Sequence, residues 1–220
     1  MVIAADAGFD HAAALGLHVD MAVGDFDSIK SALPAKQHAT RLPAEKDDSD
    51  TLAALKLGWR RGAREFHIFG GLGGRIDHAI ANIQLLAMLA HHGCAGYLYG
   101  DDVVVTAICD ARLDLSADPD DEGRIVSVFS HCDTALDVNE RGMKYTLHHA
   151  TLDNRTVRGL SNELLGENAS IDVHDGTLIV TFPSRLDTPT VMRYESHDSP
   201  LEDVEYAVTP ALVRREPRTA

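Results

Sequence analysis

The sequence predicts an α/β unit with a largely parallel sheet, followed by an all-β domain. In the first half of the chain, short β-like runs alternate with helix-like runs, whereas after about residue 110 one β-like run follows another. A polar, turn-rich stretch, "LDLSADPDDEG", lies at this change. We therefore expect a first domain over residues 1–112 and an all-β domain over residues 113–195.

The first half contains four β-like runs and two helical runs. The β-like runs are "VIAA" (2–5), "MAV" (21–23), "FHIFG" (66–70) and "AGYLY" (95–99). Residues 49–62, "SDTLAALKLGWRRG", place apolar side chains at helical spacing between an N-cap, Ser49, and a terminating Gly62. Residues 77–93 predict a second, longer helix on the same criteria.

The second half is rich in β-like runs separated by turn signals. These runs are "RIVSVFS", "KYTLHHATL", "ASIDVHDGTLIVTF" and "TVMRYE". His174-Asp175-Gly176 predicts a hairpin turn within the third run. Residues 196–220 combine prolines and charges with little periodicity, and they are predicted to form a tail of low order.

The composition limits the partners of this chain. A formal net charge of −14 over 220 residues opposes binding to nucleic acid phosphates and to anionic membranes. The three cysteines form no C-x-x-C pair, which indicates free thiols in a reducing compartment. We also find no secretory signal and no apolar run of about 18 residues. We therefore expect a cytoplasmic protein with neither a nucleic acid nor a membrane partner.

Acidic residues gather at two places in the first half. Asp25 and Asp27 follow the second β-like run, and Asp47, Asp48 and Asp50 precede the first predicted helix. Loops at the carboxyl ends of parallel strands meet at one edge of the sheet, and carboxylates in this number suit Mg²⁺. Taken alone, "GDFDS" fits an acidic turn as well as a metal site, and the helix dipole explains "EKDDSD" better than a metal does. Together the two segments favour a metal site.

A glycine-rich segment, "GGLGGRIDH" at residues 70–78, joins a predicted strand to a predicted helix. Its glycines allow a ligand to approach the backbone, the helix start offers free N–H groups to an anion, and Arg75 adds a cation. A flexible turn is the alternative. The segment matches neither the P-loop nor the dinucleotide-binding fingerprint. The histidine pairs His91-His92 and His148-His149 have no Asp or Cys at ligand spacing, so they do not predict a zinc site.

Three ordered motifs carry a resemblance to a known family. "GDFDSI" (24–29), "KDDSD" (46–50) and "GGRIDHAIANIQLL" (73–86) closely resemble the signatures of thiamine pyrophosphokinases. "AADAGFDHAAALG" upstream, and "GMKYTL" and "GLSNE" downstream, are similar to further parts of the same family. The resemblance spans roughly residues 2–182, and three motifs in order are far more specific than one.

The resemblance implies a three-layer αβα catalytic domain followed by a β-sandwich domain for thiamine binding and dimerisation. It implies a homodimer with active sites between subunits and Mg²⁺-dependent transfer of pyrophosphate from ATP to the thiamine hydroxyl. The products would be AMP and thiamine diphosphate.

By match to the motifs, the resemblance also implies site residues. The catalytic residues and metal ligands are Asp25, Asp27 and Asp50, with Asp47 or Asp48 assisting. The ATP-binding residues are Asp6, Gly73, Gly74 and Arg75. The residues on the thiamine side are Asp77, Ser161 and Asn162. Either Asp27 or Asp50 could accept the hydroxyl proton.

The residues also allow two alternative functions. A D-x-D phosphatase of the haloacid dehalogenase type would have Gly and Thr after the second Asp, whereas Ser28 and Ile29 stand there. A catalytically weak regulatory protein of the same fold would bind thiamine or a nucleotide without transfer. The complete set of aspartates argues against this second alternative.

Overall fold

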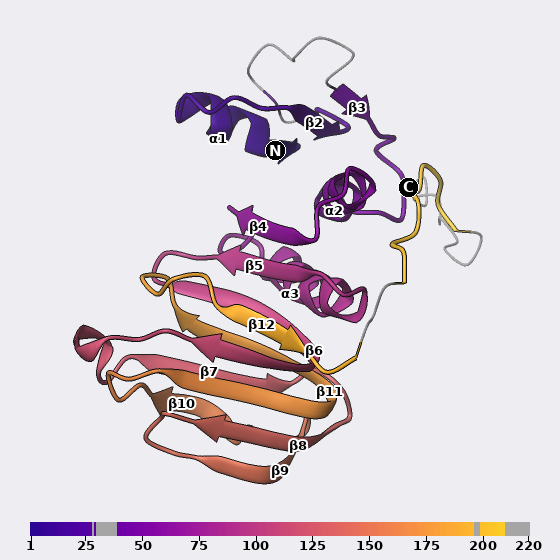
Figure 1. The fold of residues 1–220 in the computed structure, drawn as a ribbon. Coiled ribbons are helices and arrows are strands. Elements are labelled where there is room, and N and C mark those ends of the chain that lie inside the picture. Colours follow the sequence, from indigo (N-terminus) through magenta and orange to yellow (C-terminus); the bar gives the residue numbers. More distant parts are fainter. Residues whose placement is uncertain (28, 30–38, 196–198, 210–220) are drawn as a thin grey trace, which may run out of the picture. The chain divides into compact units, whose positions relative to one another are not determined.

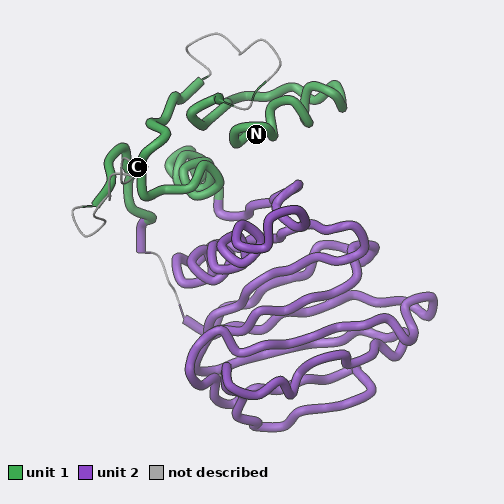
Figure 2. Tube along the Cα trace, turned by 180° about the vertical axis from the view of Figure 1, so that it is seen from behind, with its two compact units in different colours: residues 1–63, 201–220 green, residues 64–200 purple. Residues whose placement is uncertain are grey.

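The computed structural model describes residues 1–27, 29, 39–195 and 199–209. The chain divides into two compact units (Figure 2). Unit 1 comprises residues 1–63 and 201–220, and unit 2 comprises residues 64–200.

Unit 1 contains a parallel three-stranded sheet in the order β1-β2-β3. Its elements are β1 (Ile3–Ala5), α1 (Gly8–Ala14), β2 (Met21–Gly24), β3 (Ala39–Arg41) and α2 (Asp50–Arg60). The hydroxyl oxygen of Ser49 accepts the backbone N–H of Leu52 at 3.1 Å, so Ser49 caps α2. This confirms the helix predicted from residue 49.

A small apolar core holds unit 1 together. Val23 of β2, Leu42 after β3 and Ala53 of α2 are buried against one another and against Val204. Leu201 is buried as well. The described part of the predicted tail, residues 199–209, thus contributes two buried side chains, while the low order predicted for residues 196–220 stays a prediction. Residues 196–198 and 210–220 lie outside the described residues.

Unit 2 is built on a nine-stranded sheet whose main path is β10-β7-β11-β6-β5-β4 (Figure 1). Strand β12 pairs with β6, β8 pairs with β11 and β9, and α3 packs on β5 and β6. The elements are β4 (Glu65–Phe69), α3 (Ile76–His91), β5 (Ala95–Tyr99), β6 (Val103–Leu115), the 3-10 helix η2 (Pro119–Asp121), β7 (Ile125–Ser130), β8 (Thr134–Arg141), β9 (Leu147–Asp153), β10 (Gly159–Glu163), β11 (Ala169–Pro183) and β12 (Thr190–Arg193). Only β4 and β5 are parallel among these pairs of described strands. The predicted order, an α/β part followed by a β-rich part, is confirmed.

The predicted domain boundary at residue 112 falls inside β6. This strand pairs antiparallel with β5, where Tyr97 lies opposite Thr106, and with β11 along its whole length. The sheet therefore continues from the parallel pair into the antiparallel strands. Two apolar cores lie along it, a larger one among strands β5 to β11 and a smaller one where α3 packs against β5, β6 and β11, and residues 64–200 form one compact unit.

The hairpin predicted at His174-Asp175-Gly176 is wrong, because β11 is a single strand. It shifts register between Val173 and Thr177, where three residues lie opposite Asp110 of β6. Gly176 has a φ of +129°, and its N–H donates to a carboxylate oxygen of Asp110 at 2.9 Å. The turn signal in the sequence thus marks a bulge in a long strand.

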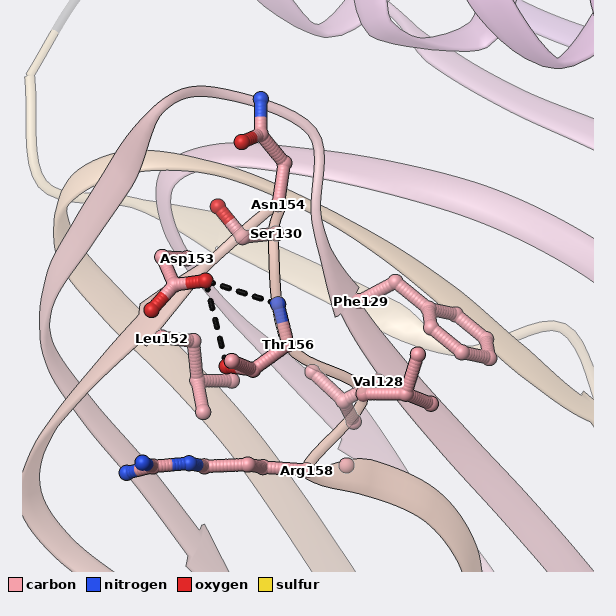
Figure 3. Close-up of a pocket in the computed structure, with 10 residues that line it drawn as sticks. Val128, Phe129, Ser130, Leu152, Asp153, Asn154, Thr156 and Arg158 are labelled. Carbon is pink, nitrogen blue, oxygen red and sulfur yellow. Dashed lines mark hydrogen bonds between the residues drawn. The ribbon is translucent and has the colours of Figure 1, made fainter.

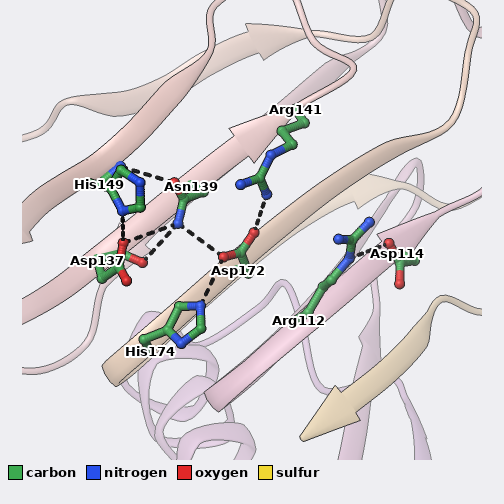
Figure 4. Close-up of polar contacts among 8 residues, drawn as sticks. All are labelled: Arg112, Asp114, Asp137, Asn139, Arg141, His149, Asp172 and His174. Carbon is green, nitrogen blue, oxygen red and sulfur yellow. Dashed lines mark hydrogen bonds and ion pairs between the residues drawn. The ribbon is translucent and has the colours of Figure 1, made fainter. Parts of the chain in front are cut away.

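A polar network crosses the β-rich part of unit 2 (Figure 4). The carboxylate of Asp172 is almost fully buried and accepts hydrogen bonds from Asn139 at 3.0 Å and Arg141 at 2.6 Å. His149 pairs with Asp137 through Nδ1. Each buried charge in the network has a polar partner, as burial requires.

No helix among the described residues has the length and apolar character needed to cross a membrane.

Candidate active site

Three carboxylates meet at the carboxyl end of the parallel sheet in unit 1. Asp6 follows β1, while Asp25 and Asp27 follow β2, and each offers one oxygen within 4.8 Å of the others. Asp6 and Asp25 are half-buried and Asp27 is exposed. The structure therefore brings together the two predicted metal ligands after β2 and adds Asp6, which the sequence assigned to ATP.

Gly24 allows these carboxylates to approach. The N–H of Asp6 donates to the carbonyl oxygen of Val23 at 2.8 Å, which extends the β1–β2 ladder to the site. Gly24 has a φ of +152°, and a Cβ there would lie 3.3 Å from the backbone of Asp6. A side chain at this position would press on the strand end that carries Asp6.

The donor set of this cluster suits a hard divalent cation. Three like charges within 4.8 Å repel one another unless a cation lies between them. The N–H of Asp27 donates to a carboxylate oxygen of Asp25 at 3.1 Å, which offsets part of this repulsion. Mg²⁺ takes oxygen ligands and typically uses one or two carboxylates with water and phosphate oxygens. The three side chains fit such an ion.

An open hollow of about 620 Å³ lies beside two of these aspartates. Its lining residues are Asp25, Asp27, Arg41, Leu42, Pro43, Ala44 and Tyr206. Arg41 ends β3, and its guanidinium lies over the ring of Phe26 at 5.8 Å from the centroid. The hollow thus combines carboxylates, a guanidinium and an apolar wall.

The aspartates of "KDDSD" have other partners. Asp48 forms a buried ion pair with Lys56, and Asp50 lies 2.9 Å from Nζ of Lys46. Asp47 accepts the backbone N–H of Thr209 at 2.9 Å. Within the described residues, the one group of three acidic or other ligating side chains close enough to share an ion is the cluster of Asp6, Asp25 and Asp27.

The glycine-rich segment before α3 belongs to unit 2. Gly70, Gly73 and Gly74 all have positive φ values, which favour glycine. The amide of Asn82 donates to the carbonyl oxygen of Gly71 at 2.9 Å. A Cβ on Gly71 would lie 2.7 Å from the Leu98 side chain. Gly71 is therefore held by contacts with Asn82 and Leu98, while Gly73 and Gly74 are exposed.

Arg75 and Asp77 form an exposed pair at the start of α3. Nε and Nη2 of Arg75 donate to the two carboxylate oxygens of Asp77 at 3.1 and 2.5 Å. These hydrogen bonds raise the pKa of Arg75 and lower the pKa of Asp77. The sequence assigned the two side chains to different substrates, whereas here they bind each other.

Ser161 and Asn162, the predicted thiamine-side residues of β10, differ in their surroundings. Ser161 is exposed, with a φ of +60°. Asn162 is 5% exposed, and its amide donates to Glu140 and to the carbonyl oxygen of Tyr145, both at 2.7 Å. Its side-chain oxygen accepts the N–H groups of Tyr145 and Glu163. Asn162 is therefore held by internal contacts, and Ser161 is the residue open to a ligand.

A smaller hollow of about 240 Å³ lies between β7 and the turn that joins β9 to β10 (Figure 3). Asp153 shapes this turn, because its carboxylate accepts the N–H groups of Arg155 and Thr156 at 2.8 Å. These bonds lower the pKa of Asp153. The carboxylate of Asp153 therefore stabilises the turn through these hydrogen bonds.

The sequence did not identify four residues of these sites: Arg41, Lys46, Glu140 and Tyr206. Lys46 belongs to the motif "KDDSD" and Arg41 lies a few residues before it, so their positive charges were the available signal. No signal in the sequence pointed to Tyr206 or Glu140, because their positions depend on contacts with residues far away in the sequence.

Comparison with known proteins identifies two matched regions. A protein-family model described as the thiamin pyrophosphokinase catalytic domain matches residues 1–98. A second, described as the thiamin pyrophosphokinase vitamin B1 binding domain, matches residues 112–178. The two regions occur in the order that the sequence predicts.

Individual relatives agree with these matches. A curated thiamine pyrophosphokinase of Bacillus subtilis (strain 168) is 28% identical over 167 residues, which cover 72% of this chain and 76% of that protein. The crystal structure of thiamine pyrophosphokinase from Bacillus subtilis has a TM-score of 0.72 at 24% identity and covers 84% of this chain and 87% of its own. The corresponding structure from Geobacillus thermodenitrificans has a TM-score of 0.70 at 26% identity, with coverages of 83% and 85%. The chain belongs to the thiamine pyrophosphokinase family.

Proposed function

We propose that this chain transfers pyrophosphate from ATP to the hydroxyl of thiamine, giving thiamine diphosphate and AMP. Membership of the family supports the reaction class. The observation that carries the proposal is the meeting of Asp6, Asp25 and Asp27 beside a hollow that also contains Arg41. Carboxylates for a metal ion and a cation for phosphate are what a metal–triphosphate complex needs.

In this proposal, Mg²⁺ is held by Asp6, Asp25 and Asp27. The bound ion would supply charge neutralisation for the triphosphate, which otherwise approaches a chain of net charge −14. Arg41, whose guanidinium belongs to the lining of the hollow, binds phosphate oxygens. The contribution of these residues is alignment and electrostatic stabilisation rather than covalent chemistry.

The reaction forms a bond between the thiamine oxygen and the β-phosphorus of ATP and breaks the bond from that phosphorus to the oxygen retained by AMP. The hydroxyl proton has to leave the attacking oxygen. Asp27 is exposed and lines the hollow, whereas Asp50 is paired with Lys46. These surroundings favour Asp27 as the proton acceptor.

The remaining assignments are made for unit 2. Arg75 and the exposed glycines 73 and 74 are proposed to contact the nucleotide, and Ser161 is proposed to contact thiamine. Asp77 then acts by orienting Arg75, to which it is hydrogen-bonded. We further propose a cytoplasmic homodimer, on the resemblance to the family.

The test is a product analysis. Purified protein is incubated with ATP, MgCl₂ and thiamine, and the products are separated by chromatography. Equal amounts of AMP and thiamine diphosphate are expected, and EDTA should abolish both. Formation of ADP or free phosphate instead would contradict the proposal. Hydrolysis of p-nitrophenyl phosphate without transfer would point to the D-x-D phosphatase.

A further inference from the structure

A segment beyond both matched family regions packs on unit 1. The matches end at residue 178, and residues 201–209, here called the C-terminal strap, lie well beyond it. The strap belongs to the same compact unit as residues 1–63. It has buried side chains of its own, so it is a structural part of the unit.

Apolar contacts fix the first half of the strap. Val204 is 7% exposed and packs with Val23, Leu42 and Ala53. Val23 immediately precedes Gly24, and Leu42 lines the hollow beside Asp25. The anchor of the strap is therefore adjacent to the strand ends that carry the acidic cluster.

The acidic motif fixes the second half of the strap through its backbone. The N–H of Glu205 donates to Asp48 at 2.9 Å, and the N–H of Thr209 donates to Asp47 at 2.9 Å. Nζ of Lys56, which is paired with Asp48, also donates to the carbonyl oxygen of Asp203 at 3.1 Å. Carboxylates that accept backbone N–H groups hold a segment in one conformation.

These contacts position Tyr206. The residue lies between Glu205 and Ala207, and the backbone of each is hydrogen-bonded to the acidic motif. Its side chain remains 53% exposed and lines the hollow together with Asp25, Asp27 and Arg41. An aromatic ring that is held by its backbone on both sides and left half-exposed in a hollow has a free surface for a ligand.

We propose that the C-terminal strap supplies Tyr206 as the residue that binds the planar base of the nucleotide, and that Asp47 and Asp48 act as its anchors. This inference rests on the proposed function. The hollow contains carboxylates and Arg41 for the metal–phosphate part of a nucleotide. Leu42, Pro43 and Tyr206 provide the apolar and aromatic surface that a base requires. Asp47 and Asp48 are then positioning residues for the strap.

The test compares Tyr206→Ala and Tyr206→Phe with the wild-type chain. Loss of one base–aromatic contact is expected to raise KM for ATP about 10-fold in Tyr206→Ala. The base is remote from the transferred group, so kcat and KM for thiamine should stay within about twofold. Tyr206→Phe keeps the ring and should behave like wild type. Tyr194→Ala, a similar loss of a partly exposed ring in unit 2, is the matched control.

The outcomes separate this inference from the proposed function. An active wild type with an unchanged KM for ATP in Tyr206→Ala overturns the inference alone, and so does a rise in KM for thiamine instead. If the wild type makes no thiamine diphosphate, the proposed function fails. Calorimetric titration with Mg·ATP then still decides the inference, which requires weaker binding by Tyr206→Ala and by a second variant, Tyr206→Leu.

Discussion

Nζ of Lys56 lies 2.9 Å from both carboxylate oxygens of Asp48, and the two side chains are 6% and 5% exposed. Each partner also serves the C-terminal strap, because Asp48 accepts the N–H of Glu205 and Lys56 donates to the carbonyl oxygen of Asp203. The pair therefore joins α2, the acidic motif and the strap. A buried pair of this kind is tolerated because its remaining hydrogen-bonding capacity is used.

Lys56→Met should destabilise the protein strongly. It leaves the carboxylate of Asp48 buried without its cation, which typically costs about 3–5 kcal/mol. The free energy of unfolding, measured by urea denaturation, should fall by this order. The double variant Lys56→Met/Asp48→Leu should be less destabilised than Lys56→Met alone, since no uncompensated charge remains. Lys144→Met, which breaks an exposed pair with Glu163, is the control and should change stability little.

Local patterns were sufficient to predict part of this site. Asp25 and Asp27 follow a short apolar run that ends at Gly24, and that pattern alone predicted two carboxylates at a strand end. The capped helix α2 was predicted in the same way, from Ser49 and the spacing of apolar residues.

Long-range contacts account for what the sequence did not predict. Asp6 joins Asp25 only because Ala5 pairs with Val23 in the parallel register. Tyr206 reaches the hollow only because Val204 and the backbone of Glu205 find partners about 150 residues away in the sequence. No local signal specifies such pairings. The continuity of the sheet across residue 112 also depends on such pairings, since β6 pairs with β5 and with β11.

Gly24→Ala should weaken metal-dependent activity. The new Cβ would lie 3.3 Å from the backbone of Asp6, and the φ of +152° is strained for a residue with a side chain. Both effects move Asp6 away from Asp25, so the Mg²⁺ concentration needed for half-maximal activity should rise. Gly62→Ala is the control, because Gly62 also has a positive φ but no atom near its Cβ position. A similar rise in both variants would show that strain, and not the approach to Asp6, is responsible.

Glu140→Gln should make stability less dependent on pH. Burial raises the pKa of Glu140 above its ordinary value of 4.5, and the hydrogen bond from Asn162 opposes this only in part. The folded state then binds a proton that the unfolded state has released. The contribution to stability is full below pH 4.5 and is lost as the pH rises through the folded-state pKa.

Glutamine keeps an acceptor for the amide of Asn162 and cannot ionise. Between pH 4.5 and 8, the Tm of Glu140→Gln should therefore fall less, or rise more, than that of the wild type. The exposed Glu167 offers the control Glu167→Gln, whose Tm profile should follow the wild type. Parallel profiles for wild type and Glu140→Gln would show that Glu140 is ionised in the folded protein.

Ser161→Ala and Asn162→Ala should affect different measurements. Ser161 is exposed, so its loss should leave Tm near the wild-type value and raise KM for thiamine. Asn162→Ala removes hydrogen bonds to Glu140, Tyr145 and Glu163, and each such bond contributes about 1 kcal/mol. A lower Tm is expected for that variant. An unchanged KM for thiamine in Ser161→Ala would remove Ser161 from the thiamine site.

Asp27→Asn should retain the fold and lose most turnover. The side chain is exposed, so the substitution disturbs no buried contact, and its backbone N–H can still donate to Asp25. It removes one negative charge from the proposed metal site and the preferred proton acceptor. A loss of about 3 kcal/mol of transition-state stabilisation corresponds to about a 100-fold fall in kcat.

Asp187→Asn is the control, because it removes an exposed aspartate from unit 2 and should retain full activity. Raised Mg²⁺ should restore Asp27→Asn in part if the residue acts mainly as a ligand, whereas no restoration at saturating Mg²⁺ would assign it to proton transfer. Near-normal turnover of Asp27→Asn at the Mg²⁺ concentration that suffices for the wild type would exclude both roles.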